Sequence, residues 1–305
     1  MVSLIFGTSE ITQSFNFVLE TDLANPINGP PGLVSLRRNE ENIKSYFIGF
    51  TSPKHNVQKY LQAVQLCFHH WRASFCDQTL LVHCHNWKSG IGKTMLSDII
   101  RITQPSNIIE YFTENPEVNS ILKEKSSLLE GVYRMSPTKV TTLQIPESQK
   151  NDIKAERGRI LEKYFGKTGV DLPHNYIDKQ PWVCFVSDVT ITINLNPIEA
   201  RFIPALVPKI CGLSIRADPI PECKGLGIIR DVNTETGMLY IITPLANIHE
   251  IDTLEIHTGE GCIELERDAL WSSQFYDEFE EDIGCVLHNV ILAETQQKYH
   301  PGRKN

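Results

Sequence analysis

Residues 79–105 constrain the fold more than any other stretch, because they join an apolar run, a polar loop with glycines and a helix-patterned segment closed by proline. This order is typical of a strand, a loop and a helix, the place where α/β proteins receive phosphate groups. The loop ends in Gly92-Lys93-Thr94, like a phosphate-binding loop. Such a loop needs glycine five positions before its Gly-Lys pair, where this chain has Trp87. We therefore predict a helix start with an exposed lysine here, and no nucleotide loop.

The flanking segments extend this pattern into an α/β domain. Residues 15–22 are an apolar run that ends on Glu20 and Asp22, and acidic residues at the carboxyl end of a buried parallel strand are where α/β sheets meet magnesium-bound phosphates. A short strand is predicted at 46–50. From Val57 to Trp71, apolar residues recur at three- and four-residue steps, which predicts an amphipathic helix.

The remainder of this half adds a β-α-β unit and a charged helix. We predict a strand at 79–84, a helix at 94–103 and a strand at 107–112, with parallel strands and a right-handed crossover. Residues 114–150 are polar and have no clear periodicity, whereas 151–165 read as one charged helix.

The second half changes to a β pattern. Apolar and polar residues alternate in 187–195, the period of a half-buried strand. Two hairpins are predicted, one around the turn NTETG at 233–237 and one around a Gly-Glu-Gly turn at 259–261. The fold class that we predict is α/β: a partial P-loop-NTPase-like parallel sheet with flanking helices, followed by a smaller, mostly-β C-terminal domain that forms a sandwich or barrel.

Composition excludes several classes of protein. The chain has 305 residues and 41% hydrophobic content, enough for two domains, and no apolar run as long as a membrane span of ~18 residues. Its eight cysteines form no CxxC pair, so we expect reduced thiols. The net charge of −8 argues mildly against a nucleic-acid partner. Five acidic residues lie in residues 277–282, on a predicted tail. The rest of the chain is therefore closer to neutral, which is compatible with a local basic groove.

Five collinear blocks resemble the polynucleotide 5'-hydroxyl kinase family, in particular its nucleolar, pre-rRNA-processing branch. The first resembles the family's Walker B strand, the second the block after it, the third the tryptophan loop with its helix and Gln-Pro strand, the fourth the arginine-bearing lid and the fifth a C-terminal hairpin. They are FVLETDLANPINGPPGLVSL, YFIGFTSPKHNVQKYLQAV, LLVHCHNWKSGIG with SDIIRITQPSNIIEY, IKAERGRILEKYFG, and CKGLGIIRDVNTETGMLYIITPL. Together the resemblance covers roughly residues 15 to 270.

The resemblance implies a domain plan and an activity. A partial kinase α/β domain would span 1–170, a β-rich C-terminal domain 171–272, and an acidic then basic tail 273–305. The implied activity is a phosphotransferase: the γ-phosphate of ATP, bound with Mg²⁺, passes to the 5'-hydroxyl of RNA during pre-rRNA spacer processing. The implied partners are that RNA and an endoribonuclease whose cut leaves the hydroxyl. The implied location is the nucleus and nucleolus, with no membrane.

Several positions depart from the family pattern. Ala24-Asn25 replace Gly-Gln, Ile27-Asn28 replace Glu-Phe, His83-Cys84 replace Asn-Thr, and Asn86 replaces the glycine before the tryptophan. The family's P-loop precedes the Walker B strand, whereas only fourteen residues precede FNFVLETD here. We expect weak ATP binding by this chain. Three alternatives follow: an active kinase, a non-catalytic scaffold that keeps the fold and an RNA or protein surface, or an incomplete sequence.

Each candidate site residue has a structural alternative. Asp22, with Glu20, is expected to organise magnesium and ATP, although an acid after a strand is also a common turn or cap residue. Trp87 is expected to hold RNA by stacking on a base, or else to anchor its loop. The family's lid implies that Lys154, Arg157 and Arg159 neutralise phosphoryl charge, the alternative being a solvated helix face.

The run His83-Cys84-His85 resembles a set of metal ligands. On a strand, the two histidines point to one face and the cysteine to the other, so the three cannot share a metal ion without a break in the strand. We expect structural histidines rather than a zinc site.

Overall fold

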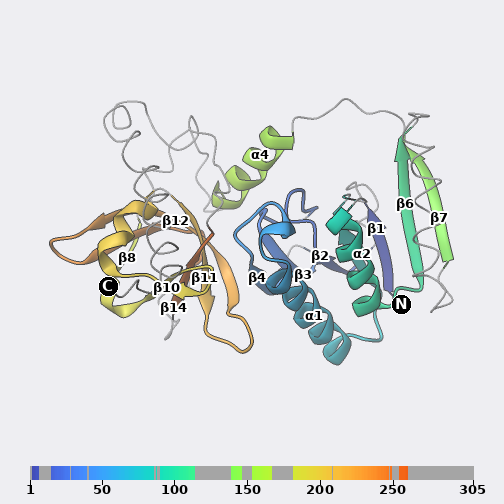
Figure 1. Ribbon diagram of the computed structural model, residues 1–305, viewed down its shortest axis with the longest axis horizontal. Helices are drawn as coiled ribbons and strands as arrows, with labels where there is room; N and C mark the ends of the chain where they lie inside the picture. The colour runs from blue at the N-terminus through green and yellow to red at the C-terminus, as the bar shows by residue number, and fades with distance from the viewer. Residues whose placement is uncertain are drawn as a thin grey trace, which may run out of the picture.

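The computed structural model describes residues 2–6, 15–27, 29–39, 41–85, 87, 90–113, 139–145, 153–166, 181–207, 209–246, 248 and 254–259. These residues form two seven-stranded sheets that follow one another along the chain (Figure 1). The first sheet carries the candidate site and the second is the β-rich part.

The first sheet has the order β4-β3-β2-β5-β1-β6-β7. Its strands are β1 (Val2–Phe6), β2 (Phe17–Glu20), β3 (Leu33–Arg38), β4 (Glu41–Phe47), β5 (Leu80–Cys84), β6 (Asn107–Thr113) and β7 (Lys139–Ile145). The strands β2, β5, β1, β6 and β7 run parallel, and β3 and β4 add an antiparallel edge. The carboxyl ends of the parallel strands therefore open onto one edge of the sheet.

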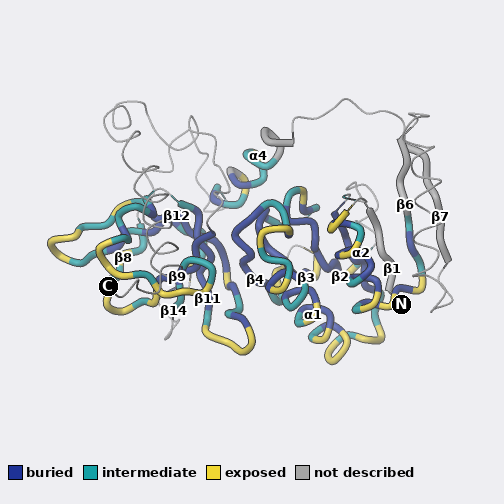
Figure 2. Tube along the Cα trace, in the orientation of Figure 1, coloured by how far each residue is buried: buried dark blue, intermediate teal, exposed yellow. Residues whose placement is uncertain are grey.

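Two helices, α1 (Val57–Ser74) and α2 (Gly90–Thr103), cover one face of this sheet. Asn56 caps α1, because its side chain accepts a hydrogen bond from the Lys59 backbone N–H. The buried side of α1 repeats at helical spacing, as its pattern predicted, and it packs with Leu80, Val82 and Cys84 of β5. Figure 2 shows the central strands buried between exposed outer turns. This packing fixes where β2 and β5 end.

The second sheet has the order β10-β9-β14-β11-β12-β13-β8. Its strands are β8 (Trp182–Phe185), β9 (Thr190–Ile193), β10 (Asn196–Pro197), β11 (Ile210–Ile215), β12 (Glu222–Asn233), β13 (Met238–Ile242) and β14 (Leu254–Thr258). Short 3₁₀ turns lie at Pro53–His55, Val186–Asp188 and Ala200–Leu206. Leu206 and Ile203 of the last turn pack into the core of this sheet.

Helix α4 (Ile153–Gly166) packs where the two sheets meet. Its buried Leu161 and Phe165 share a core with Leu33 and Phe47 of the first sheet and with apolar residues of β11, β12 and β13. The hydroxyl of Tyr164 accepts a hydrogen bond of 2.8 Å from the Leu226 backbone N–H. Figure 1 places α4 above this junction.

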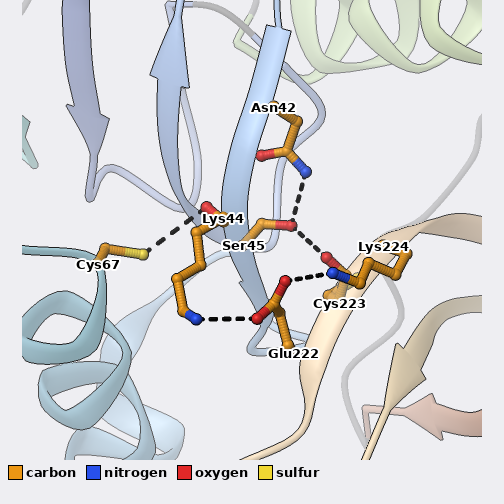
Figure 3. Close-up of polar contacts among 7 residues, drawn as sticks. All are labelled: Asn42, Lys44, Ser45, Cys67, Glu222, Cys223 and Lys224. Atoms are coloured by element: carbon orange, nitrogen blue, oxygen red, sulfur yellow. Dashed lines mark hydrogen bonds and ion pairs between the residues drawn. The ribbon is translucent and has the colours of Figure 1, made fainter. Parts of the chain in front are cut away.

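Polar contacts join the edge strand β4 to β12 (Figure 3). The buried Ser45 hydroxyl donates to the Cys223 carbonyl at 2.7 Å and accepts from the Asn42 amide at 3.0 Å. Lys44 forms an ion pair of 2.9 Å with Glu222, which also binds Lys224. The exposed edge of the first sheet is thereby covered by the second sheet.

The predicted fold class is confirmed: a mixed α/β unit with a parallel sheet and helices, followed by a β unit. The helices at 57–71 and 151–165, the strands at 79–84 and 107–112, and the hairpin around NTETG are also present. The second unit is one mixed seven-stranded sheet in the described ranges. The partner strand of the second predicted hairpin, CIELE, and the acidic tail lie outside the described residues.

The parallel arrangement of β5 and β6 is confirmed, with β1 between them. Three features differ from the sequence-based predictions. The strand predicted at 46–50 is β4, which begins at Glu41 and ends at Phe47 because it pairs with β3 along that range. The helix α2 begins at Gly90, so Gly92-Lys93-Thr94 lie in its first turns. Segments 33–38 and 139–145 form strands that were not predicted, because their apolar residues do not alternate cleanly and pairing with neighbours decides their conformation.

Candidate functional site at the carboxyl edge of the parallel sheet

Glu20 and His83 are partners in the register of β2 and β5, and they form a buried pair. The His83 Nδ1 lies 2.8 Å from a Glu20 carboxylate oxygen, and the side chains are 2% and 1% exposed. Burial alone would lower the pKa of His83, but the hydrogen bond and charge of Glu20 outweigh it and raise that pKa. Glu20 is therefore engaged inside the sheet.

Asp22 follows β2 by two residues, and the turn around it is firmly held. The Thr21 backbone N–H and hydroxyl both donate to the His83 carbonyl, and Tyr60 on α1 donates to the Thr21 carbonyl at 2.9 Å. The Oδ1 atom of Asp22 accepts from the backbone N–H groups of Ala24 and Asn25 at 2.9 and 3.2 Å. Within the described residues, no side chain or backbone donor binds the other carboxylate oxygen, Oδ2.

His85 comes directly after β5, and its ring centroid lies 6.5 Å from that of Tyr60 on α1. Its Nδ1 accepts a hydrogen bond of 3.3 Å from the Trp87 backbone N–H, while its buried Nε2 has no hydrogen-bond partner among the described residues. Burial lowers the pKa of His85 more than the nearby Asp22 charge raises it, which favours the neutral ring.

The structure does not give His83 and His85 the shared surroundings that strict strand alternation predicted. His83 pairs with Glu20 on the face of β2 that carries Val18, whereas the ring of His85 lies near α1 because β5 ends before it. Cys84 packs in the helix-covered core, and burial raises the pKa of its thiol to about 12. In the part of the chain that the structure describes, no three His, Cys, Asp or Glu residues are grouped to hold a metal ion.

Trp87 is partly buried and packs against the core beneath α2. Its ring lies directly on Gly92: a Cβ atom added there would be 2.4 Å from two ring carbons. The ring centroid is 6.5 Å from that of His85. The anchoring role is thus visible, and base stacking by the part of the ring that remains exposed stays a prediction.

The lid-like cations lie on α4. Arg157 is half-buried and Arg159 is exposed, while the side chain of Lys154 is outside the described residues. Helix α4 contacts the junction of the two sheets through Leu161, Tyr164 and Phe165. The residues that lie at the carboxyl edge are Glu20, Asp22, His83, His85 and Trp87, and the role of the α4 cations stays a prediction.

The residues present fit one part of an ATP–magnesium site. Magnesium is usually held by one or two carboxylates plus phosphates and water, and Asp22 offers one oriented carboxylate whose Oδ2 atom has no donor among the described residues. Glu20 is 1% exposed and bound to His83, so it lies behind that edge. Gly92 is covered by Trp87 and cannot line a phosphate cradle. Residues 7–14, which follow the central strand β1, lie outside the described residues.

The sequence predicts Glu20, Asp22 and Trp87 as site residues, and the structure places two further residues, Tyr60 and His85, at the same edge. Tyr60 was counted only as part of a helix, although its hydroxyl fixes the Thr21 turn. His85 was treated as one of a possible zinc set, and its unpartnered nitrogen could not be inferred without the positions of Trp87 and Asp22. An apolar helix face that carries a tyrosine is a weak sign of such a contact, because buried tyrosine hydroxyls need a partner.

The class of protein follows from this fold and from comparison with known proteins. A parallel α/β sheet with a β unit behind it matches the solved structure of a wild-type Clp1p–Pcf11p complex with a TM-score of 0.61 at 13% identity, over 85% of this chain and 75% of the other. At that identity the match shows the fold. In sequence, the family described as mRNA cleavage and polyadenylation factor CLP1 P-loop matches residues 10–167, just over half of the chain. The chain belongs to this family.

Curated relatives point to one branch. The chain is 25% identical over 284 residues to the polynucleotide 5'-hydroxyl-kinase NOL9 of Arabidopsis thaliana, covering 77% of this chain and 75% of the relative. It is 25% identical over 135 residues to human NOL9 and 29% identical over 118 residues to GRC3 of Candida albicans. The last two matches cover 40% and 34% of this chain but only 19% and 17% of the relatives' length. Among the described residues, no helix is long and apolar enough to cross a membrane.

Proposed function

We propose that this chain is a polynucleotide 5'-hydroxyl kinase that phosphorylates RNA ends in pre-rRNA processing. The observations that carry the proposal are the similarity to Arabidopsis NOL9 over 77% of the chain and, in this chain, an oriented Asp22 carboxylate at the carboxyl end of β2. A kinase site of this type works mainly by positioning and by charge stabilisation, so the placing of a few groups decides its chemistry.

Each candidate residue then has a defined task. ATP would supply the γ-phosphoryl group, and Asp22 would hold its magnesium ion. Glu20 orients this edge through His83 rather than touching the metal. Trp87 holds the first base of the RNA, and the cations of α4, Lys154, Arg157 and Arg159, neutralise phosphoryl charge when α4 lies over the edge. The domain boundary at 170/171 belongs to this proposal, as do the endoribonuclease partner and the nucleolar location.

The direct test is transfer of radioactive phosphate from ATP to a short 5'-hydroxyl RNA. We expect labelling of this RNA, none of the same RNA with a 5'-phosphate, and a loss of at least about 100-fold for Asp22→Asn, because one charge-stabilising group typically contributes on the order of 100-fold or more. The matched control is Asp98→Asn. Asp98 is a partly exposed acid on α2 that forms an ion pair with the exposed Arg101, and it is not one of the residues placed at the carboxyl edge. Labelling that survives Asp22→Asn would overturn the assignment of Asp22.

A second function, an RNA-binding scaffold without phosphoryl transfer, is favoured by one observation: residues 7–14, which lie between β1 and β2 in the chain, read GTSEITQS and contain no Gly-Lys pair. RNA binding separates the two functions. Under the scaffold hypothesis, 5'-hydroxyl RNA binds but is not labelled. Trp87→Ala should then weaken binding by about 1 to 3 kcal/mol with little change in salt dependence, and Arg157→Ala should flatten the salt slope. Fluorescence anisotropy at several salt concentrations measures both.

A further inference from the structure

His85 has an arrangement that neither metal binding nor core packing explains. Its ring is 6% exposed, its Nδ1 is occupied by the Trp87 backbone N–H, and its Nε2 is buried without a hydrogen-bond partner among the described residues. Because Nδ1 accepts a hydrogen bond, the proton of the neutral ring sits on Nε2. A buried N–H donor without a partner destabilises the folded chain, and such groups in native proteins call for an explanation.

The surroundings of His85 define what could satisfy this donor. Asp22 follows β2 and His85 follows the adjacent strand β5, and the two strand ends are joined because the Thr21 backbone N–H donates to the His83 carbonyl. The Oδ1 atom of Asp22 is already bound by two backbone N–H groups. The edge therefore offers one N–H donor, on His85, and one carboxylate acceptor, Oδ2 of Asp22. Both follow the carboxyl ends of adjacent parallel strands, β5 and β2.

We propose that His85 binds the RNA end, with its Nε2–H donating to the oxygen of the terminal 5'-hydroxyl while that hydroxyl donates to the lone pair of Asp22 Oδ2 that a magnesium ion on the same oxygen leaves open. A hydroxyl matches this pair because it accepts and donates at once. A phosphate group in the same place would bring a second negative charge against the Asp22 carboxylate. The nitrogen is shielded in the structure, so the RNA end reaches it only with a local displacement of neighbouring side chains. The proposal rests on the proposed action on 5'-hydroxyl RNA.

The test compares three ends on one short single-stranded RNA: 5'-hydroxyl, 5'-deoxy and 5'-phosphate. We expect the whole chain to bind the hydroxyl end about 5- to 10-fold more tightly than the deoxy end, the effect of one or two net hydrogen bonds. His85→Phe should lose most of this preference and keep only the part that comes from Asp22, and His85→Gln, which keeps an N–H donor, should recover part of what His85→Phe loses. His69→Gln, on the exposed side of α1, is the matched control and should bind like the wild type.

A second measurement uses the wild-type chain, so it does not require that any variant folds. In protein labelled with ¹⁵N-histidine, the His85 nitrogens should show the Nε2–H tautomer in the free chain. The Nε2 resonance should shift with hydroxyl RNA and much less with deoxy RNA. An Nδ1–H tautomer, or equal shifts with both RNAs, overturns the proposal.

The outcomes distinguish this inference from the proposed function. If the RNA binds and Trp87→Ala weakens it, but the hydroxyl and deoxy ends bind equally, the His85 inference is wrong and the proposed function stands. If the phosphate end shows the His85-dependent preference instead, the acceptor is a phosphate oxygen and the hydroxyl assignment is wrong. If no RNA end binds at all, both proposals are wrong.

Discussion

The carboxyl edge of β2 and β5 and the junction between β4 and β12 both bury polar side chains, but they satisfy them differently. At the junction, the Ser45 hydroxyl is fully buried and has both a donor and an acceptor partner (Figure 3). At the carboxyl edge, His85 is almost as buried, yet one of its ring nitrogens has no partner among the described residues.

Under the proposal for His85, this difference separates polar groups that complete the fold from a polar group that meets a ligand. A buried polar group whose hydrogen bonds are complete needs no ligand, since desolvation is already offset. A buried donor left open beside a carboxylate keeps an unfavourable energy that a bound molecule can remove. The Glu20–His83 pair lies between these cases, because its two side chains form a buried hydrogen bond with each other and lie beside the edge where His85 Nε2 has no partner among the described residues.

The largest effect should come from closing the space between the two sheets. In Gly259→Ala, the added Cβ would lie 2.1 Å from the Gly49 carbonyl oxygen, and Gly49 has a φ of +82° that other residues rarely adopt. Backbone on both sides resists movement, so we expect a loss of about 3 kcal/mol in the free energy of unfolding. Urea unfolding measures it. Gly158→Ala on α4, where the Cβ meets nothing within 4 Å, is the control and should be neutral or stabilising.

The next effect concerns the buried pair at the carboxyl edge. Glu20→Gln should cost about 2 kcal/mol at pH 5.5, because the protonated His83 loses its charged partner. The folded pKa of His83 is raised above its unfolded value of about 6.5. The folded state therefore holds the proton more tightly, and this stabilisation is present below pH 6.5 and is lost as pH rises through the folded pKa.

The measurement is the difference in unfolding free energy between wild type and Glu20→Gln at pH 5.5 and pH 9. His85 acts in the opposite direction, since its lowered pKa makes stability fall as pH drops below about 6.5, but it is present in both proteins and cancels in the difference. A difference that does not shrink at pH 9 would show that the pair is not charged in the folded state.

A smaller effect is expected at the junction. Ser45→Ala should cost about 1.5 kcal/mol, because the Cys223 carbonyl and the Asn42 amide lose their buried partner. RNA binding should not change, since this group takes no part in the carboxyl edge. Ser187→Ala, an exposed serine on a 3₁₀ turn, should leave stability as it is. A loss of RNA binding in folded Ser45→Ala would break the distinction between the two regions.

The smallest effect is expected for the ion pair beside Ser45. Lys44→Met should change stability by about 0.5 kcal/mol, because Lys44 and Glu222 are 22% and 19% exposed and Glu222 keeps Lys224 as a second partner. The wild-type advantage should disappear in 1 M salt if it is electrostatic. A larger, salt-independent loss would assign the effect to the contact of the Lys44 ammonium with the face of the Tyr46 ring.

The sequence by itself determined the elements that depend on neighbouring residues in the chain, and it determined that a carboxylate follows the strand β2. Apolar periodicity placed α1 and β5, and the run ending on Asp22 placed a carboxylate at a strand terminus, because side-chain period depends only on neighbours along the chain. Spacing alone also excluded a phosphate loop at Gly92, and the structure shows Trp87 lying on that glycine.

Tertiary structure alone decided which of these groups act together. The insertion of β1 between β5 and β6, the docking of β12 on β4 and the pairing of Glu20 with His83 join residues that are far apart in sequence. The same is true of the open nitrogen of His85, which depends on the end of β5, the position of α1 and the backbone of Trp87 at once. Hydrogen bonds are directional and short, so whether a buried group is satisfied is settled only when the distant segments have packed.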